Sequence, residues 1–259
     1  MASGRTASAG GGPRGVGWVV TRPISIVVGL VVAAVLLTAC GGSKYRYVTS
    51  KSPELVYKLP VGTRIVRVGV EAADTYYRLP KDWAVFDENQ VLAEVANARK
   101  LSPLSLADLA AEQHVNGFDA SPEPSVSNVF GSTVAPSGRQ LLLVLDDEAR
   151  DNTSLRALRG LFVDIDEEIE QAKKDNVAPK VKVHGRSDDV VRPGGFHGSQ
   201  VIFDYVGEGA TLTFNQTTLF DSESRVAYLF IIGCEANCYV NNYEAINDVV
   251  ESWTIKEHK

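Results

Sequence analysis

The last third of the chain holds three apolar runs separated by short turn-forming segments, and no other feature restricts the possible folds as strongly. The runs are Ser199–Val206, Ala210–Phe220 and Arg225–Gly233. The segments between them, Gly207-Glu208-Gly209 and Asp221–Ser224, are rich in residues that let a chain turn back on itself. We therefore predict an antiparallel β-meander over this third of the chain.

A final helix is expected after the meander. Asn241 or Asn242 can cap its start, because a short polar side chain there can accept a backbone N–H of the first turn. Its apolar stripe recurs at helical spacing in Tyr243, Ile246, Val249, Val250 and Trp253. A sheet must bury its apolar face against another layer, so we expect this helix to pack on the meander.

Further elements are expected upstream. The strands are Thr63–Val70, Tyr76–Leu79, Trp83–Asp87 and Gln140–Leu145, and the helices are Ser105–Val115, capped by Ser105, and Asp164–Lys174. Between them, Ser121–Ser137 is rich in Ser, Pro, Asn and Gly and indicates a long loop. The sequence thus predicts an α+β fold, an antiparallel β-sheet with packed helices.

The N-terminal segment has the composition of an export signal. It carries Arg5, Arg14 and Arg22 and no acidic residue, and Ile24–Leu37 then forms an apolar run. The run ends in Leu37-Thr38-Ala39-Cys40, which resembles the bacterial lipobox. The resemblance implies cleavage before Cys40 and two or three acyl chains, such as palmitate, on that cysteine. Two or more chains anchor a protein stably in a membrane.

The alternative is an uncleaved transmembrane anchor. Ile24–Ala39 would make roughly 24 Å of helix at about 1.5 Å per residue, whereas the hydrocarbon core needs about 30 Å. The lipoprotein interpretation is therefore favoured. It divides the chain into a signal peptide (1–39), a lipid anchor with a flexible tether (40–54) and a single globular α+β domain (55–259).

Removal of the signal would leave an acidic domain. Lys plus Arg falls from 26 to 23 against 32 acidic residues, giving a net charge of −9. A domain of this charge without an arginine-rich stripe is a poor candidate for binding nucleic acid. We expect it at the extracytoplasmic face of the bacterial cell membrane, attached through the lipid on Cys40.

Cys234 and Cys238 remain after Cys40 is assigned to lipid. In an oxidising compartment an even pair indicates a disulfide, provided that the chain turns between them. A thioredoxin-type pair would have two intervening residues rather than three, and no second Cys pair or His-x-x-x-His completes a zinc site. We expect a local disulfide, and no metal or cofactor.

Catalytic candidates are few. His197, flanked by glycines, could act as a general base with Asp146 or Asp147, or could simply be a turn residue at the start of the meander. No nucleophile motif accompanies it. The acidic residues around Asp166 lack the ligand spacing of a calcium loop and suit the first turn of a helix. The sequence therefore favours a protein that is not an enzyme.

Two short patterns carry a resemblance to a known family. Tyr77–Phe86 has the order strand, Pro-turn, Trp, strand, and three later strands lead into a helix closing with Val250-Glu251-Ser252-Trp253-Thr254. Together they resemble the PsbP-like fold of extrinsic photosystem II subunits, a Ran-release factor and many actinobacterial envelope lipoproteins. Over residues 65–256 the resemblance implies an α/β/α sandwich, a binding or assembly role, and no catalytic residues. Residues 150–195 depart from the pattern and are interpreted as an insertion.

The functional prediction is a non-enzymatic binding or assembly module of the cell envelope. Its partner would be an envelope protein or a cell-wall component, bound by a surface around Trp83, His197 and the Ser121–Ser137 loop. Two alternatives are a carrier of a lipid or other apolar ligand, which requires an open cavity, and a hydrolase that uses His197 with Asp146 or Asp147.

Overall fold

A computed structural model of the protein describes residues 43–51, 54–61, 64–132, 134–152, 154–207 and 209–257. They form one compact unit that begins at Lys44. Cys40 and the predicted signal peptide lie outside the described residues.

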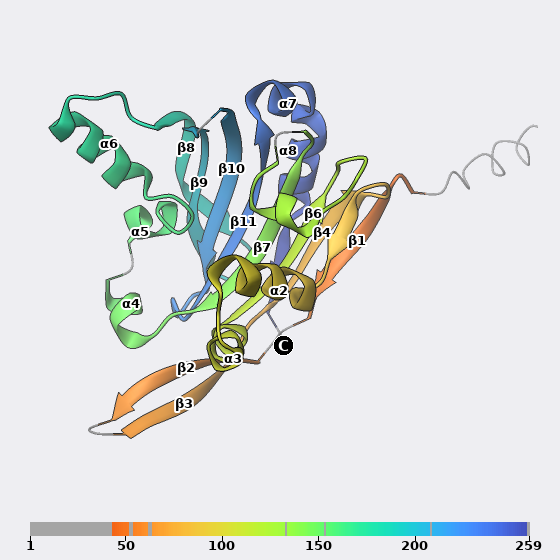
Figure 1. The fold of residues 1–259 in the computed structure, drawn as a ribbon. Helices are drawn as coiled ribbons and strands as arrows, with labels where there is room; N and C mark the ends of the chain where they lie inside the picture. Colours follow the sequence, from red (N-terminus) through yellow and green to blue (C-terminus); the bar gives the residue numbers. More distant parts are fainter. Residues whose placement is uncertain are drawn as a thin grey trace, which may run out of the picture. The chain divides into compact units, whose positions relative to one another are not determined.

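The centre of the unit is a seven-stranded antiparallel sheet (Figure 1). In spatial order its strands are β5 (Ala84–Phe86), β6 (Gln113–Asp119), β7 (Ser137–Val144), β11 (Val226–Glu235), β10 (Thr211–Phe220), β9 (Phe196–Val206) and β8 (Val181–Arg192). Consecutive strands β8 to β11 pair with each other in sequence order. The predicted meander is confirmed, and so is strand β7 at Gln140–Leu145.

Two smaller sheets accompany the large one. β1 (Tyr45–Ser50), β4 (Asp74–Pro80) and β12 (Thr254–Lys256) form a three-stranded sheet with β4 in the middle. β2 (Glu54–Val61) and β3 (Arg64–Glu71) form a hairpin that projects from the rest of the unit (Figure 1). Strands were predicted at β3, β4 and β5, and all three are present.

The helices lie on both faces of the large sheet. They are α2 (Glu88–Arg99), α3 (Pro103–Glu112), the 3-10 helix η2 (Val126–Phe130), α4 (Asp147–Asp151), α5 (Leu155–Arg159), α6 (Ile165–Asp175), α7 (Ala236–Asn241) and α8 (Tyr243–Ser252). The helices predicted at α6 and α8 are confirmed, and with them the α+β class with an antiparallel sheet and packed helices.

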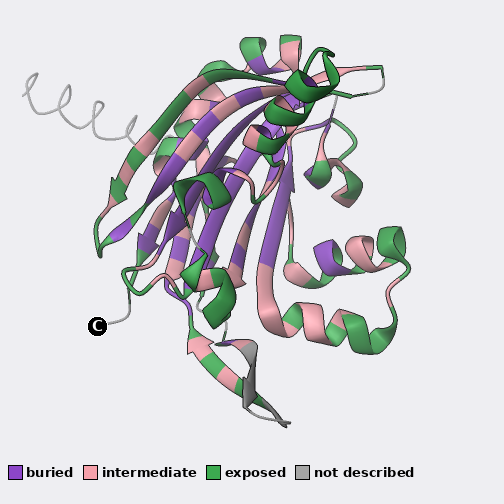
Figure 2. Cartoon of the chain, turned by 90° about the vertical axis from the view of Figure 1, so that its left-hand side faces the viewer, coloured by how far each residue is buried: buried purple, intermediate pink, exposed green. Residues whose placement is uncertain are grey.

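Strand β11 shows why the sheet is covered on both sides. Its alternate residues Tyr228, Phe230 and Ile232 enter the main core with α8 and β4, while Ile231 packs with α6 on the opposite face. Successive side chains of a strand point to opposite faces, so a continuous apolar run requires a layer on each face. Figure 2 shows the central strands buried along much of their length.

The N-terminal boundary of the domain was predicted wrongly. Tyr45–Ser50 lies in the expected tether, yet it is strand β1 and pairs along its whole length with β4. Its polar composition is compatible with an edge strand, because Val48 packs on the core while Tyr47 on the alternate face is exposed. The folded unit therefore begins about ten residues earlier than expected.

The helix expected at Ser105–Val115 is also corrected. Helix α3 starts at Pro103, its cap is Ser102, and it ends at Glu112. Val115 lies in the following strand, β6, where it is buried against Leu141 and α2. Local spacing cannot distinguish an apolar strand residue from the last turn of a helix. Helix α2 and strand β8 were not predicted.

Candidate functional site

An open apolar groove lies where β8, β9 and β10 meet α7 and α8. Its volume is about 560 Å³. The lining residues are His184 from β8, Ile202 and Asp204 from β9, Thr213 from β10, Ala236, Tyr239 and Val240 from α7, and Tyr243 from α8. A concave site of this size, lined mainly by apolar and aromatic side chains with a few polar groups, is typical of a small-ligand site.

Three polar side chains meet at the strand side of the groove. Asp204 Oδ1 accepts a hydrogen bond of 2.7 Å from Thr213 Oγ1, and its Oδ2 lies 2.7 Å from His184 Nε2. The carboxylate stands between the imidazole and the hydroxyl. Activation of a nucleophile requires the base beside the hydroxyl, with the acid behind the base. The geometry therefore suits orientation of a ligand rather than nucleophilic catalysis.

The opposite wall of the groove is helix α7. Tyr239 is buried and its ring faces Tyr243 at a centroid distance of 6.4 Å. Burial raises the pKa of Tyr239 to about 12. The phenol therefore stays neutral at physiological pH. Val240 and Tyr243 form the rim and are 73% and 52% exposed.

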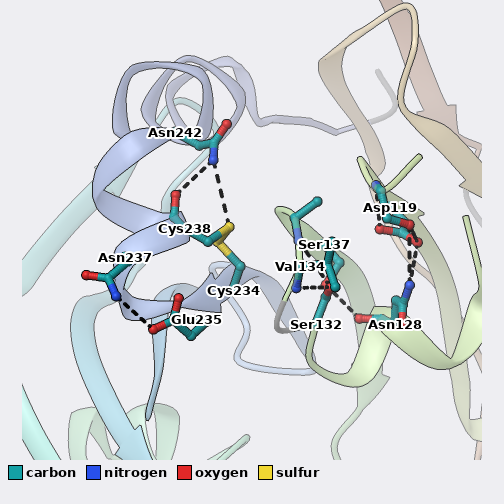
Figure 3. Close-up of a disulfide and its surroundings, with 12 residues drawn as sticks. Asp119, Asn128, Ser132, Val134, Ser137, Cys234, Glu235, Asn237, Cys238 and Asn242 are labelled. Carbon is teal, nitrogen blue, oxygen red and sulfur yellow. Dashed lines mark hydrogen bonds between the residues drawn. A yellow bond between two sulfur atoms is a disulfide. The ribbon is translucent and has the colours of Figure 1, made fainter. Parts of the chain in front are cut away.

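The predicted disulfide is present and holds α7. Cys234, at the end of β11, is bonded to Cys238 in α7 across a Cα–Cα distance of 5.9 Å (Figure 3). Asn242 Nδ2 donates to the Cys238 carbonyl oxygen at 2.8 Å. Asn242 is the first residue before α8, as predicted, but its side chain closes α7 and does not cap α8. A helix of six residues is too short to be stable alone, so these bonds position the groove wall.

Trp83 does not form a binding surface. Its side chain is only 7% exposed and stacks on Phe118 at a centroid distance of 5.9 Å, inside the main core. This prediction was wrong because the Trp83 side chain packs into the core, whereas Lys81 and Asp82 of the turn before it are exposed. Trp83 is a structural residue.

His197 and the two predicted acids are not brought together. His197 is exposed, and its Nδ1 lies 3.2 Å from the Gly195 carbonyl oxygen. Asp146 caps α4 by accepting from Ala149 N, and Asp147 pairs with Arg150. Within the described residues no carboxylate forms an ion pair with His197. The hydrolase arrangement suggested by the sequence is therefore not assembled.

The Ser121–Ser137 loop is held by a buried carboxylate. Asp119 accepts hydrogen bonds from the backbone and hydroxyl of Ser121, from Ser125 N and from Asn128 Nδ2. Figure 3 shows the bond between Asp119 and Asn128. Burial would raise the pKa of Asp119, but these hydrogen bonds outweigh it and hold the pKa below its ordinary value. The loop contains the helix η2 and is more ordered than a Ser/Pro-rich segment suggests.

Two further properties concern the described residues alone. No helix among them is both long and apolar enough to cross a bilayer. In the same part of the chain, no three His, Cys, Asp or Glu side chains gather where they could hold a metal ion.

Sequence reasoning missed the groove, although one signal was available. Asp204 is an acid within the apolar run Ser199–Val206, at a position that shares a face with Ile202. A partly buried acid in such a run requires hydrogen-bonding partners. His184 and Thr213 supply them from neighbouring strands, and their positions depend on strand register that the sequence alone does not show.

Comparisons with known proteins give similarity to solved structures only. No family model matches the chain, and no curated protein matches it. It is similar to the crystal structure of LpqN, described as involved in cell envelope biogenesis of Mycobacterium tuberculosis, with 12% identity and a TM-score of 0.39 over 83% of this chain and 92% of that one.

Two further similar structures carry the name Mog1. The Saccharomyces cerevisiae Ran-binding protein Mog1p has 10% identity and a TM-score of 0.34, covering 79% of this chain and 97% of its own. A mutant of Mog1 has 10% identity and a TM-score of 0.34, with 71% and 91% covered. At such identities the functional residues of these proteins cannot be transferred to this chain.

Proposed function

We propose that the protein is a lipid-anchored, extracytoplasmic lipoprotein of the bacterial cell membrane whose folded unit is a non-enzymatic binding module. The groove between β8–β10 and α7–α8 is its binding site. Ile24–Leu37 followed by Leu37-Thr38-Ala39-Cys40 supports the anchor. An oxidising compartment also suits the Cys234–Cys238 disulfide. The PsbP-like resemblance stays a prediction that supports a binding role.

The groove is the observation that supports a binding role most directly. At about 560 Å³ it falls within the range of small-ligand sites, which span roughly 300–1,000 Å³. The groove therefore favours a small apolar ligand over the envelope protein or wall component that the sequence placed first.

The same residues argue against a hydrolase. His197 bonds to a backbone carbonyl, Asp146 and Asp147 serve helix α4, and Asp204 stands between His184 and Thr213. None of these sets places an imidazole beside a hydroxyl, which acyl transfer by a serine or threonine nucleophile requires. Binding without turnover is the activity that this geometry supports.

The anchor is tested on the full chain expressed in a bacterium. Wild-type protein should fractionate with membranes, incorporate labelled palmitate and have a modified Cys40 by mass spectrometry. The Cys40→Ala variant should lose the label and leave the membrane fraction. Membrane fractionation of Cys40→Ala equal to wild type would show that the anchor is not lipid on this residue.

The groove is tested with N-phenyl-naphthylamine, an uncharged probe that fluoresces in apolar surroundings. Val240→Asp and Tyr243→Asp place a charge on the exposed rim without disturbing the core, and each should weaken probe binding several-fold. Val191→Asp is the matched control, because Val191 is 67% exposed on β8 but does not line the groove. Equal binding by all three variants would exclude the groove as the site.

A further inference from the structure

The rim of the groove lies at the same end of the folded unit as the start of β1. Ser252 Oγ, near the end of α8, accepts from Arg78 N in β4 at 2.9 Å. One turn earlier, Asp248 Oδ2 accepts from the hydroxyl of Tyr45 at 3.0 Å. Helix α8 therefore runs in the same direction as β1, and its N-terminal end lies on the Tyr45 side.

Tyr243 lies farther toward that side. It precedes Asp248 by five residues, or about 7.5 Å of helix, and α7 with Val240 comes before it. Figure 1 shows α7 and the start of α8 at the end of the unit where β1 begins. The two exposed apolar rim residues thus project near the point where the chain enters the fold.

The chain outside the described residues limits how far this end can be from a membrane. Cys40 precedes Tyr45 by five residues, which span at most about 18 Å when fully extended. If Cys40 carries lipid, Tyr45 stays within that distance of the bilayer surface. A valine 73% exposed and a tyrosine 52% exposed at the same end are then held beside lipid.

Charge at this end gives secondary support. Lys44 and Lys81 are exposed and adjacent, because Lys81 N donates to the Lys44 carbonyl oxygen at 3.1 Å. Both cations can approach lipid phosphates. Glu244 is also exposed on α8, so apolar contact through Val240 and Tyr243, rather than net charge, must carry the attraction. Tyrosine suits this position because its ring and hydroxyl together match the interfacial region of a bilayer.

We propose that this end of the folded unit docks on the lipid bilayer, with Val240 and Tyr243 inserted at the interface, so that the groove opens toward the acyl chains. The proposal rests on the lipid anchor and the groove of the proposed function. It adds the orientation of the unit and the source of the apolar ligand, which enters the groove directly from the membrane.

The test uses the full lipidated chain in vesicles of phosphatidylcholine and phosphatidylglycerol, with or without brominated acyl chains that quench tryptophan. Val240→Trp and, separately, Tyr243→Trp each add the fluorescence of one tryptophan to that of the native protein. Most of this added fluorescence should be quenched in brominated vesicles. Val191→Trp is the control, since Val191 pairs with His197, which lies about 16 Å along β9 from Ile202. Its added emission should not change. The native Trp83 and Trp253 are buried and supply a constant background.

Each outcome has a separate meaning. Quenching at positions 240 and 243 but not at 191 supports docking. If all variants float with the vesicles but positions 240 and 243 are not quenched, or 191 is quenched equally, the docking proposal is overturned while the anchor stands. If no variant floats with the vesicles, the lipid anchor of the proposed function fails, and docking fails with it.

Discussion

The indole nitrogen of Trp253 donates a hydrogen bond of 2.9 Å to Oε1 of Gln140, although the two residues are separated by 113 positions and both are buried. The bond joins the end of α8 to β7, an inner strand of the large sheet. The amide nitrogen of Gln140 in turn donates to Ser50 in β1 at 3.1 Å. One buried amide thus connects the large sheet, the three-stranded sheet and the C-terminal helix.

Replacing Gln140 with Leu tests this connection. The substitution leaves the indole N–H of Trp253 and the hydroxyl of Ser50 without that partner in the core, so we expect a loss of about 2 kcal/mol in the free energy of unfolding. Urea denaturation measures it. Gln171→Leu on the exposed face of α6 is the matched control and should change stability little. A Gln140→Leu protein as stable as wild type would mean that the amide is replaceable by apolar packing.

Removing the disulfide should affect both stability and the groove. We expect the Cys234→Ala/Cys238→Ala double variant to lose about 2 kcal/mol, since the closed loop is short. Because α7 carries Tyr239 and Val240, the variant should also bind the apolar probe more weakly. Wild type measured with and without dithiothreitol provides the comparison. Unchanged probe binding by a folded, disulfide-free protein would show that packing alone positions α7.

Truncation of Trp83 distinguishes a core residue from a surface residue. Trp83→Ala should lower the free energy of unfolding by about 3–5 kcal/mol, because it removes a buried indole stacked on Phe118. Trp83→Phe keeps an aromatic ring and should cost far less. Thermal and urea unfolding of both variants measure the difference. A stable Trp83→Ala protein with impaired partner binding would restore the surface role predicted from the sequence.

Asp119 should make stability depend on acid pH. Its pKa in the folded state lies below the ordinary value of 3.8, so protons bind the unfolded state more readily. Its contribution is therefore fully present above the unfolded pKa and is lost as pH falls through the folded pKa. We expect Asp119→Asn to be destabilised at neutral pH by about 2 kcal/mol.

The free energy of unfolding, measured by urea denaturation at a series of acidic pH values, checks this prediction. As pH falls, wild type should converge toward Asp119→Asn, because the carboxylate that distinguishes them becomes protonated. Asp151→Asn is the control, since Asp151 is exposed at the end of α4. A constant difference between wild type and Asp119→Asn down to strongly acidic pH would exclude Asp119 as the titrating group.

Much of the fold could be predicted from local pattern. The meander is readable because three apolar runs are separated by turn residues, and α6 and α8 because their apolar residues recur at helical spacing. Strand β8 was missed because it is an exposed edge strand with charged residues and two register irregularities. Strand β1 was missed for a related reason, since its pairing with β4 supplies what its own composition does not indicate.

The candidate site could be predicted far less well. The sequence favoured Trp83, whose large apolar side chain can serve a surface or a core equally, and His197, whose glycine neighbours suggested accessibility. Burial of Trp83 excluded the first, and the contact between His197 and Gly195 left the second without a carboxylate. Neither outcome depends on local composition, because burial and pairing are properties of the assembled sheet.

Local patterns in the sequence were enough to predict the α+β class of fold, the pairing of Cys234 with Cys238 and a lipid anchor at Cys40. Each of these predictions depends on the order and spacing of residues that lie close together in the chain. They can therefore be made without knowing how the chain packs. By contrast, the groove that His184, Asp204 and Thr213 share with Tyr239 is visible only in the folded protein. Those residues come from different elements, and register and helix packing, which depend on the whole core, set the distances among them.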